Sequence, residues 1–372
     1  MKKMKNKTVN QKLAEEAIRH RLFLSRYSTG EANRLAAFLQ RINASLAERI
    51  ITALDKIPAG TTWGLKQDAV IRAAINKLST QVHKAIYDDL EASAKKLMSQ
   101  EVEYQVRMLR AVIPAQVQAV AEVAAVNASQ AWSAAIAEPF QGALLSQWAG
   151  NQSASFVGMV TNTIRSGYIL GETTDQILRR VRGGVNSVGV MARAQNDVSA
   201  VVKSAISHFA AEAREQTAQA NEDIIKAREW LSTLDTKTSA TCIIRDKKQY
   251  TLDKEPQPIG HKIPYGAGPG KIHFCCRSTE TWVVKSWREL GIDADEMPEG
   301  VRASMDGEVP GDTTYATWVK NQPARVLRQV FGTERGQAIA DGKLTVPELF
   351  TDKGEYISLE RLKELDAQAF AN

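Results

Sequence analysis

Cysteine is scarce in this chain, and long apolar runs are missing. The 372 residues include three cysteines, two of them adjacent, and an odd number in this arrangement makes a poor disulfide framework. We therefore expect the protein to fold in a reducing cytoplasm, with its thiols free or bound to metal. No run of about 18 consecutive apolar residues occurs, so no membrane span is expected. Residues 1–20 also lack the apolar core of a secretory signal.

The sequence signatures of several common enzyme classes are missing as well. The chain has no Walker phosphate loop, no Gly-x-Gly-x-x-Gly opening a helix, no His-Glu-x-x-His and no Gly-x-Ser-x-Gly. Each of these patterns fixes a phosphate cradle, a metal site or a nucleophile in a known geometry. We therefore expect a protein that is not a stand-alone enzyme.

The charge balance is mildly basic. The formal net charge is +6 over the whole chain, and positive charge is concentrated locally at residues 2–5 and 179–182. Such blocks attract phosphate groups, but they are more often parts of solvated surfaces. Composition alone therefore leaves contact with nucleic acid open.

Most of the chain has the apolar periodicity of amphipathic helices. The pattern predicts a helix over residues 31–54 that begins at a capping box formed by Ser28 and Glu31. Pro58 ends this pattern because proline cannot continue the helical hydrogen-bond ladder. Further helices are predicted over residues 65–113, 117–137, 144–165, 173–181 and 190–228.

The pattern changes at Trp230. Residues 230–235 have the composition of a strand that leads into a polar turn, and residues 253–271 form a loop rich in proline and glycine. Residues 281–284 fit either a strand or the start of a helix. A linker is predicted over residues 291–298.

Helical patterns return near the C-terminus, over residues 315–330 and after Ser358, with shorter helices between them. The predicted fold class is therefore α+β and predominantly α-helical. It comprises a long helical N-terminal region, a small α+β domain and a helical C-terminal extension.

A candidate metal site lies in the non-helical segment. Cys242, His273 and Cys276 supply two thiols and an imidazole, which are preferred ligands of zinc. His261, Asp246 or Cys275 could supply a fourth ligand. Zinc bound in this way would tie together the two ends of a loop that has little apolar core of its own.

Two other interpretations of the same residues stay open. The cysteines could be small buried apolar residues, with His273 hydrogen-bonded to the backbone. A thiol nucleophile with a histidine base is also formally available, although no local pattern of a catalytic cysteine surrounds Cys242 or Cys276.

The segment 230–279 contains a distinctive set of residues: Trp230, Asp235, Thr238, Ser239, Cys242, Arg245, Asp246, Tyr250, Pro264, His273, Phe274, Cys276, Arg277 and Ser278. In these residues it resembles the phage Mu F-like domain of minor head proteins, the phage head morphogenesis family. The chain departs from the family pattern at Lys247, where the family usually has glycine, and at Cys275, where asparagine or glycine is common.

A second similarity to the same proteins lies downstream, at Asp306–Pro310, Tyr315–Gln322 and Phe331–Arg335. Together the matches cover roughly residues 160–365 of the chain. The resemblance implies a helical N-terminal region over residues 1–165, a Mu F-like head morphogenesis domain over 166–290 and a helical C-terminal extension over 291–372.

The resemblance further implies a minor capsid protein that is associated with the portal vertex and acts in head morphogenesis and in genome packaging or delivery. Its expected partners are the portal protein, the capsid protein and packaged double-stranded DNA bound without sequence preference. We expect few copies per particle, in the virion after assembly in the host cytoplasm. The family implies no catalytic residue.

Two alternatives remain at this point. The chain could be a virion-carried, DNA-binding ejection protein, whose binding to duplex DNA would weaken steeply with salt. It could also be a zinc-dependent hydrolase or a toxin carried in the head.

Overall fold

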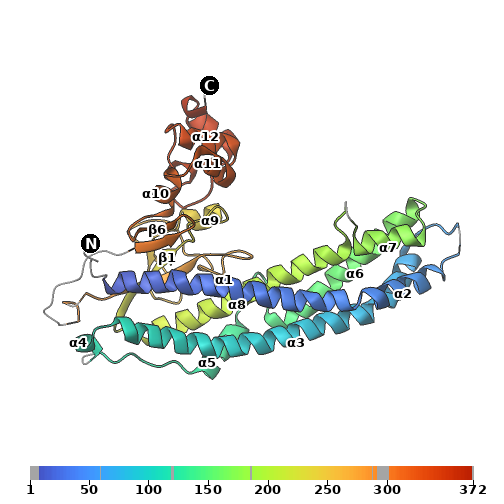
Figure 1. Cartoon of the computed structure of the whole chain (residues 1–372), viewed down its shortest axis with the longest axis horizontal. Coiled ribbons are helices and arrows are strands. Elements are labelled where there is room, and N and C mark those ends of the chain that lie inside the picture. Colours follow the sequence, from blue (N-terminus) through green and yellow to red (C-terminus); the bar gives the residue numbers. More distant parts are fainter. Residues whose placement is uncertain are drawn as a thin grey trace. The chain divides into compact units, whose positions relative to one another are not determined.

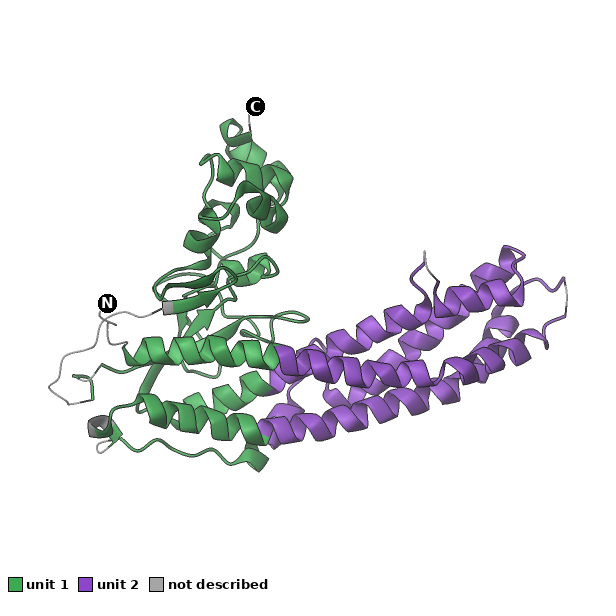
Figure 2. Cartoon of the chain, in the orientation of Figure 1, with its two compact units in different colours: residues 1–25, 99–131, 210–372 green, residues 26–98, 132–209 purple. Residues whose placement is uncertain are grey.

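The computed structural model describes residues 8–58, 60–118, 121–184, 187–286, 288–290 and 301–370. It has the predicted α+β class, predominantly helical, with a small four-stranded antiparallel sheet, a two-stranded one and long N-terminal helices (Figure 1). The chain forms two compact units (Figure 2). Unit 1 comprises residues 1–25, 99–131 and 210–372, and unit 2 comprises residues 26–98 and 132–209. The domain boundaries at residues 165 and 290 remain a prediction from sequence.

The helices before the sheet follow the predicted pattern in most places. The sequence pattern favours Thr173 or Thr174 as the cap of α7, and the structure has Thr173, whose side chain accepts a hydrogen bond from the backbone N–H of Gln176. The predicted helices over residues 65–113, 144–165, 173–181 and 190–228 correspond to α3 (Leu65–Val112), α6 (Leu145–Ile169), α7 (Thr174–Arg182) and α8 (Val190–Ala220). The single helix predicted over residues 31–54 is divided between α1 (Val9–Arg41), which begins earlier, and α2 (Asn43–Leu54).

The predicted helix start at Ser28 is wrong. Helix α1 continues through residues 28–31, and the break comes later, at Ile42. Buried leucines lie on both sides of the expected cap, at Leu24 and Leu35. The burial of each leucine stabilises a continuous helix by roughly 2 kcal/mol, which exceeds the cost of about 1 kcal/mol for the helical glycine at position 30.

The predicted helix over residues 117–137 is wrong in its first half. Helix α4 covers only Ala115–Gln118, and α5 covers Ala128–Ala137. Between them the side chain of Asn221 holds the backbone of Ala124, accepting from its N–H at 2.8 Å and donating to its carbonyl at 3.3 Å. This side-chain pairing satisfies the peptide without a helix.

The sheet begins earlier than predicted. Helix α8 ends at Ala220, and β1 covers Ile225–Leu231, so residues 225–228 are strand rather than helix. The strand order is β3-β2-β1-β4, with β2 at Gln249–Tyr250, β3 at Pro258–Ile259 and β4 at Thr279–Val284. Pairing on both edges of β1 satisfies its backbone, which a sequence pattern alone does not reveal.

The C-terminal region has a short hairpin followed by short helices. Pro323 lies between α10 and α11, so the single helix predicted over residues 315–330 is wrong in its middle. Ser358 caps α13 as predicted. The predicted linker 291–298 lies outside the described residues. The elements are β5 (Val301–Ser304), β6 (Gly307–Pro310), α10 (Tyr315–Lys320), α11 (Ala324–Phe331), α12 (Thr333–Ala340), η1 (Pro347–Leu349), α13 (Leu359–Leu365) and η2 (Gln368–Phe370).

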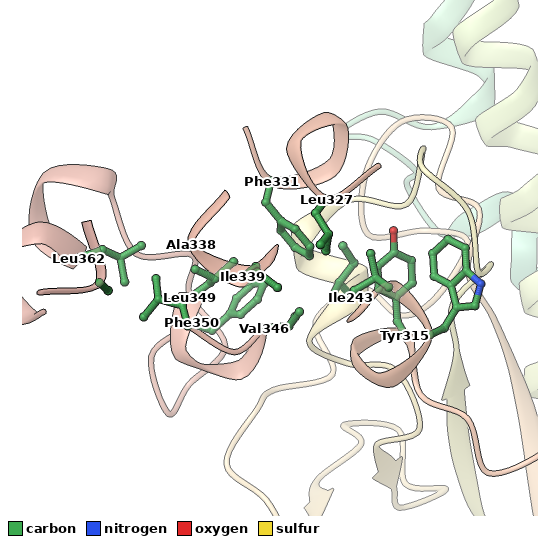
Figure 3. Close-up of a cluster of buried hydrophobic side chains, with 14 of the residues drawn as sticks. Ile243, Tyr315, Leu327, Phe331, Ala338, Ile339, Val346, Leu349, Phe350 and Leu362 are labelled. Carbon is green, nitrogen blue, oxygen red and sulfur yellow. The ribbon is translucent and has the colours of Figure 1, made fainter. Parts of the chain in front are cut away.

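These short C-terminal elements surround an apolar core (Figure 3). Phe331 of α11, Ile339 of α12 and Leu349 of η1 meet in it, and Ile243 from the preceding segment packs against the same cluster. Among the described residues, no helix has the length and apolar character needed to cross a membrane.

Candidate metal centre

The two ends of the proline- and glycine-rich loop come together. Cys242 lies in α9 (Ala240–Ile243), and His273 and Cys276 lie in the turn before β4. The Sγ atom of Cys242 is 3.6 Å from the Sγ of Cys276 and 3.4 Å from Nε2 of His273. All three ligand atoms lie within 4.8 Å of one another. The group could therefore hold a metal ion.

The spacing of these atoms fits tetrahedral zinc. With zinc–sulfur bonds of about 2.3 Å and zinc–nitrogen bonds of about 2.0 Å, tetrahedral angles place two sulfurs about 3.8 Å apart and a sulfur and a nitrogen about 3.5 Å apart. The observed distances of 3.6 and 3.4 Å are close to both values. Zinc binding would therefore require little change in the Cys242–Cys276 and Cys242–His273 distances.

The local backbone brings His273 and Cys276 together. Between them, Cys275 adopts a left-handed conformation with φ of 54°, and the backbone N–H of Cys276 donates to the carbonyl of His273 at 3.2 Å. Only glycine and asparagine adopt such a conformation at low cost. The turn therefore exposes Cys275 and buries Cys276.

The imidazole of His273 has one ring nitrogen held by the backbone. Its Nδ1 lies 2.9 Å from the carbonyl oxygen of Phe274, so Nδ1–H is the donor. In the neutral ring this leaves the lone pair on Nε2, which faces Cys242 and the hydroxyl of Ser239. A backbone carbonyl fixes the tautomer of metal-binding histidines in the same way.

The two buried sulfurs lie within hydrogen-bonding distance of each other. A hydrogen bond from the Cys242 thiol lowers the pKa of Cys276 well below its usual value, and His273 lowers it further. The same contact raises the pKa of Cys242. The hydrogen bond to Cys276 also raises the pKa of His273. Cys276 is therefore the sulfur that is most readily available as a thiolate, the form that binds metal.

Several groups from distant parts of the chain support this turn. The guanidinium of Arg21, in α1, donates to the backbone carbonyls of Cys276 and Arg277, and the backbone N–H of Gly270 donates to the Cys276 sulfur at 3.3 Å. Arg277 pairs with Asp235. Sequence reasoning missed Arg21, because no local pattern marks a partner that lies 255 residues away.

None of the three predicted fourth ligands belongs to the group within the described part of the chain. Asp246 is buried in an ion pair with Arg302 at 2.7 Å and also accepts backbone N–H groups of Ser232 and Tyr315. His261 is hydrogen-bonded to the carbonyl of Gln249. Cys275 is exposed.

As the alternative of small buried cysteines expects, Cys242 and Cys276 are buried and His273 is hydrogen-bonded to the backbone. Both buried sulfurs also have polar partners, which a purely apolar role does not need. A thiol next to an imidazole is also the pair that nucleophilic catalysis uses, but both sulfurs are almost fully buried. Comparisons with family models, curated proteins and solved structures give no match to this chain.

Proposed function

We propose that this protein is a minor head protein of a tailed bacteriophage, built into the particle in few copies at the portal vertex. Its Cys242–His273–Cys276 site holds zinc in this proposal. The portal or capsid protein is its partner in assembly, and the zinc supports the segment of residues 225–284, which we call the cysteine segment. The main support for the proposal is the backbone conformation at Lys247 and Cys275, the two positions where the chain departs from the family pattern.

Lys247 and Cys275 have φ values of 63° and 54°. Among the described residues, Gln141 is the one other non-glycine residue with positive φ. The left-handed conformation costs an ordinary L-residue about 1–2 kcal/mol and costs glycine almost nothing. Glycine at position 247, and glycine or asparagine at position 275, are the residues that these two turns favour. The family's usual residues therefore suit the backbone of this chain.

The other motif residues join the same segment together. Arg245 donates to the carbonyl of Pro264 at 3.0 Å, and Thr238 donates to the carbonyl of Thr233 at 2.6 Å. Trp230 and Tyr250 pack against both buried cysteines. These contacts give the motif a structural role, which supports an assembly protein over an enzyme.

Zinc suits this role because the loop within the segment has few buried apolar residues to hold it. The loop between residues 243 and 272 has short strands and many turns, so its order depends on what joins its ends. A structural metal contributes its binding free energy directly to folding.

The test is the location of the protein in particles. Mass spectrometry and cryo-electron microscopy of purified procapsids and virions should find it at the portal vertex, in far fewer copies than the major capsid protein. Absence from both kinds of particle would contradict the proposal. Metal analysis of the purified chain should find one zinc per chain, retained in Cys275→Ser and lost in Cys276→Ser.

A second candidate role, contact with packaged DNA, is favoured by α7. This helix carries exposed Arg179, Arg180 and Arg182 on one amphipathic element of unit 2. Each arginine that contacts a phosphate steepens the salt dependence of binding by about one. Replacing all three with alanine should flatten that dependence for duplex DNA. An unchanged slope would contradict this role.

A further inference from the structure

The metal site has three protein ligands, and the kind of zinc site depends on what fills the fourth position. Structural zinc sites are usually closed by four protein ligands, whereas sites with three keep a position for water or another small ligand. Cys242, His273 and Cys276 form the complete cluster of candidate ligands among the residues that the structure describes.

Ser239 is a half-buried polar side chain beside the cluster. Its Oγ lies 2.8 Å from Nε2 of His273 and caps α9, accepting from the backbone N–H of Cys242 at 3.4 Å. A neutral hydroxyl is not among the usual zinc ligands, which are thiolate, imidazole and carboxylate. It is well suited to hydrogen-bond a ligand that the metal holds.

The residues of the cluster differ in exposure. Cys242 and Cys276 are almost fully buried, whereas Ser239 and His273 are half-buried and the neighbouring Phe274 is exposed. We therefore expect a small molecule to reach the metal from the side of Ser239 and His273 rather than from the side of the sulfurs.

The charges around the cluster also suit an added ligand. Two thiolates balance the charge of a zinc ion, so the bound metal carries no excess negative charge that would repel a small anion. The guanidinium group of Arg21 lies close to the same turn and adds positive charge, whereas that of Arg277 is paired with Asp235.

We infer that the metal held by Cys242, His273 and Cys276 has a fourth coordination position open to an exogenous monodentate ligand, water or a small anion, which Ser239 hydrogen-bonds. This inference rests on the proposed metal site. It places the centre with exchangeable zinc sites rather than with closed structural ones.

The test uses the full chain loaded with Co²⁺, whose absorption reports its ligands. Sulfur-to-cobalt charge transfer shows that the two thiolates bind, and the d–d bands respond to the fourth ligand. Titration with azide should change the d–d bands saturably in the wild type. Ser239→Ala should keep this response with azide affinity about tenfold weaker, the size expected for a lost second-shell contact.

Ser239→Cys is the matched variant, because a third thiolate would fill the position. It should strengthen the charge-transfer band and abolish the azide response. The wild-type titration decides the matter even if this variant does not fold. Thiolate charge transfer with d–d bands that azide leaves unchanged would overturn the open position while leaving the metal site intact. Absence of thiolate charge transfer would overturn both.

Discussion

The cysteine segment and the C-terminal segment of residues 301–370 are neighbours in unit 1, but different forces hold them. The buried apolar side chains of the cysteine segment are divided among several clusters, one of which joins Trp230, Tyr250 and Tyr265 to the two buried cysteines. The interior of the segment also contains charged side chains, with Arg228 fully buried and Glu280 nearly so. The C-terminal segment instead has a continuous apolar cluster of aliphatic and aromatic side chains.

This difference predicts which kind of substitution should destabilise each segment most. An apolar core loses stability in proportion to the volume removed from it. A polar interior loses stability when one partner of a buried pair is removed, because the other is left without compensation. The two segments meet where Asp246 pairs with Arg302, so one change there should affect both.

Removal of Arg302 should have the largest effect. Arg302→Met leaves the buried carboxylate of Asp246 without its cation, which we expect to lower the free energy of unfolding by about 3–5 kcal/mol. Denaturant unfolding measures this. Arg361→Met is the control, because the Arg361–Glu364 pair is exposed and should contribute at most about 0.5 kcal/mol. Equal effects of the two variants would show that the buried pair does not join the segments.

Truncation in the apolar core should come next. Leu349 is fully buried in the C-terminal cluster, so Leu349→Ala should cost about 3 kcal/mol. Leu365→Ala, at an exposed leucine, should be nearly neutral. We expect the cobalt spectrum of Leu349→Ala to be unchanged well below its melting temperature. A lost spectrum under those conditions would show that the metal site depends on the C-terminal core.

Removal of the metal should lower the stability of the chain through the cysteine segment. Free zinc at about 100 times its dissociation constant stabilises the folded chain by about 2.7 kcal/mol, and a chelator should remove this stabilisation. Thermal melting with and without chelator measures the change. Cys275→Ser should keep the difference and Cys276→Ser should lose it. A chelator effect that persists in Cys276→Ser would place the metal elsewhere.

Relief of the left-handed turn should give a smaller, stabilising change. Lys247→Gly removes a side chain from a residue with φ of 63°, and we expect a gain of about 0.5–1 kcal/mol after the loss of the Lys247–Glu229 ion pair. Lys248→Gly is the control, since its φ is not positive, and should destabilise. Destabilisation by both variants would remove the support that this turn gives to the family assignment.

A pH effect in the cysteine segment should be the smallest. Partial burial lowers the pKa of His261, and its Nδ1 accepts from the backbone N–H of Ile263. A pKa that is lower in the folded state stabilises the protein above the unfolded pKa, near 6.5, and the stabilisation is lost as the pH falls through the folded value. His261→Gln should reduce the dependence of unfolding free energy on pH below 7. If the pH dependence of the unfolding free energy is unchanged in this variant, titratable groups other than His261 cause it.

The helices were the most predictable part of the fold. Thr173 and Ser358 were identified as caps because capping is local, needing one side chain and one backbone N–H a few residues away. The cap predicted at Ser28 was wrong because α1 continues through it, with buried leucines on both sides of the position. The start of strand β1 was mispredicted because a strand depends on its partners, and its partner residues 279–284 lie more than 45 residues further along the chain.

The candidate site was only partly predictable. Cys242, His273 and Cys276 stood out because thiols and imidazoles are rare and chemically distinctive. Asp246 was wrongly predicted as a possible fourth ligand because it pairs with Arg302, which lies 56 residues away in the sequence. Ser239 was part of the family pattern, but its place beside His273 depends on the closed loop.

The sequence by itself determined the predominantly helical class, the position of most helices and which three residues are the candidate metal ligands. Local periodicity and side-chain chemistry suffice for these, because both act over a few residues or within one. Only the tertiary structure decided that the sulfurs and the imidazole meet, that Asp246 is committed elsewhere and that the cluster stays three-membered. Those outcomes depend on contacts between residues far apart in the chain, where burial and pairing outweigh local preference.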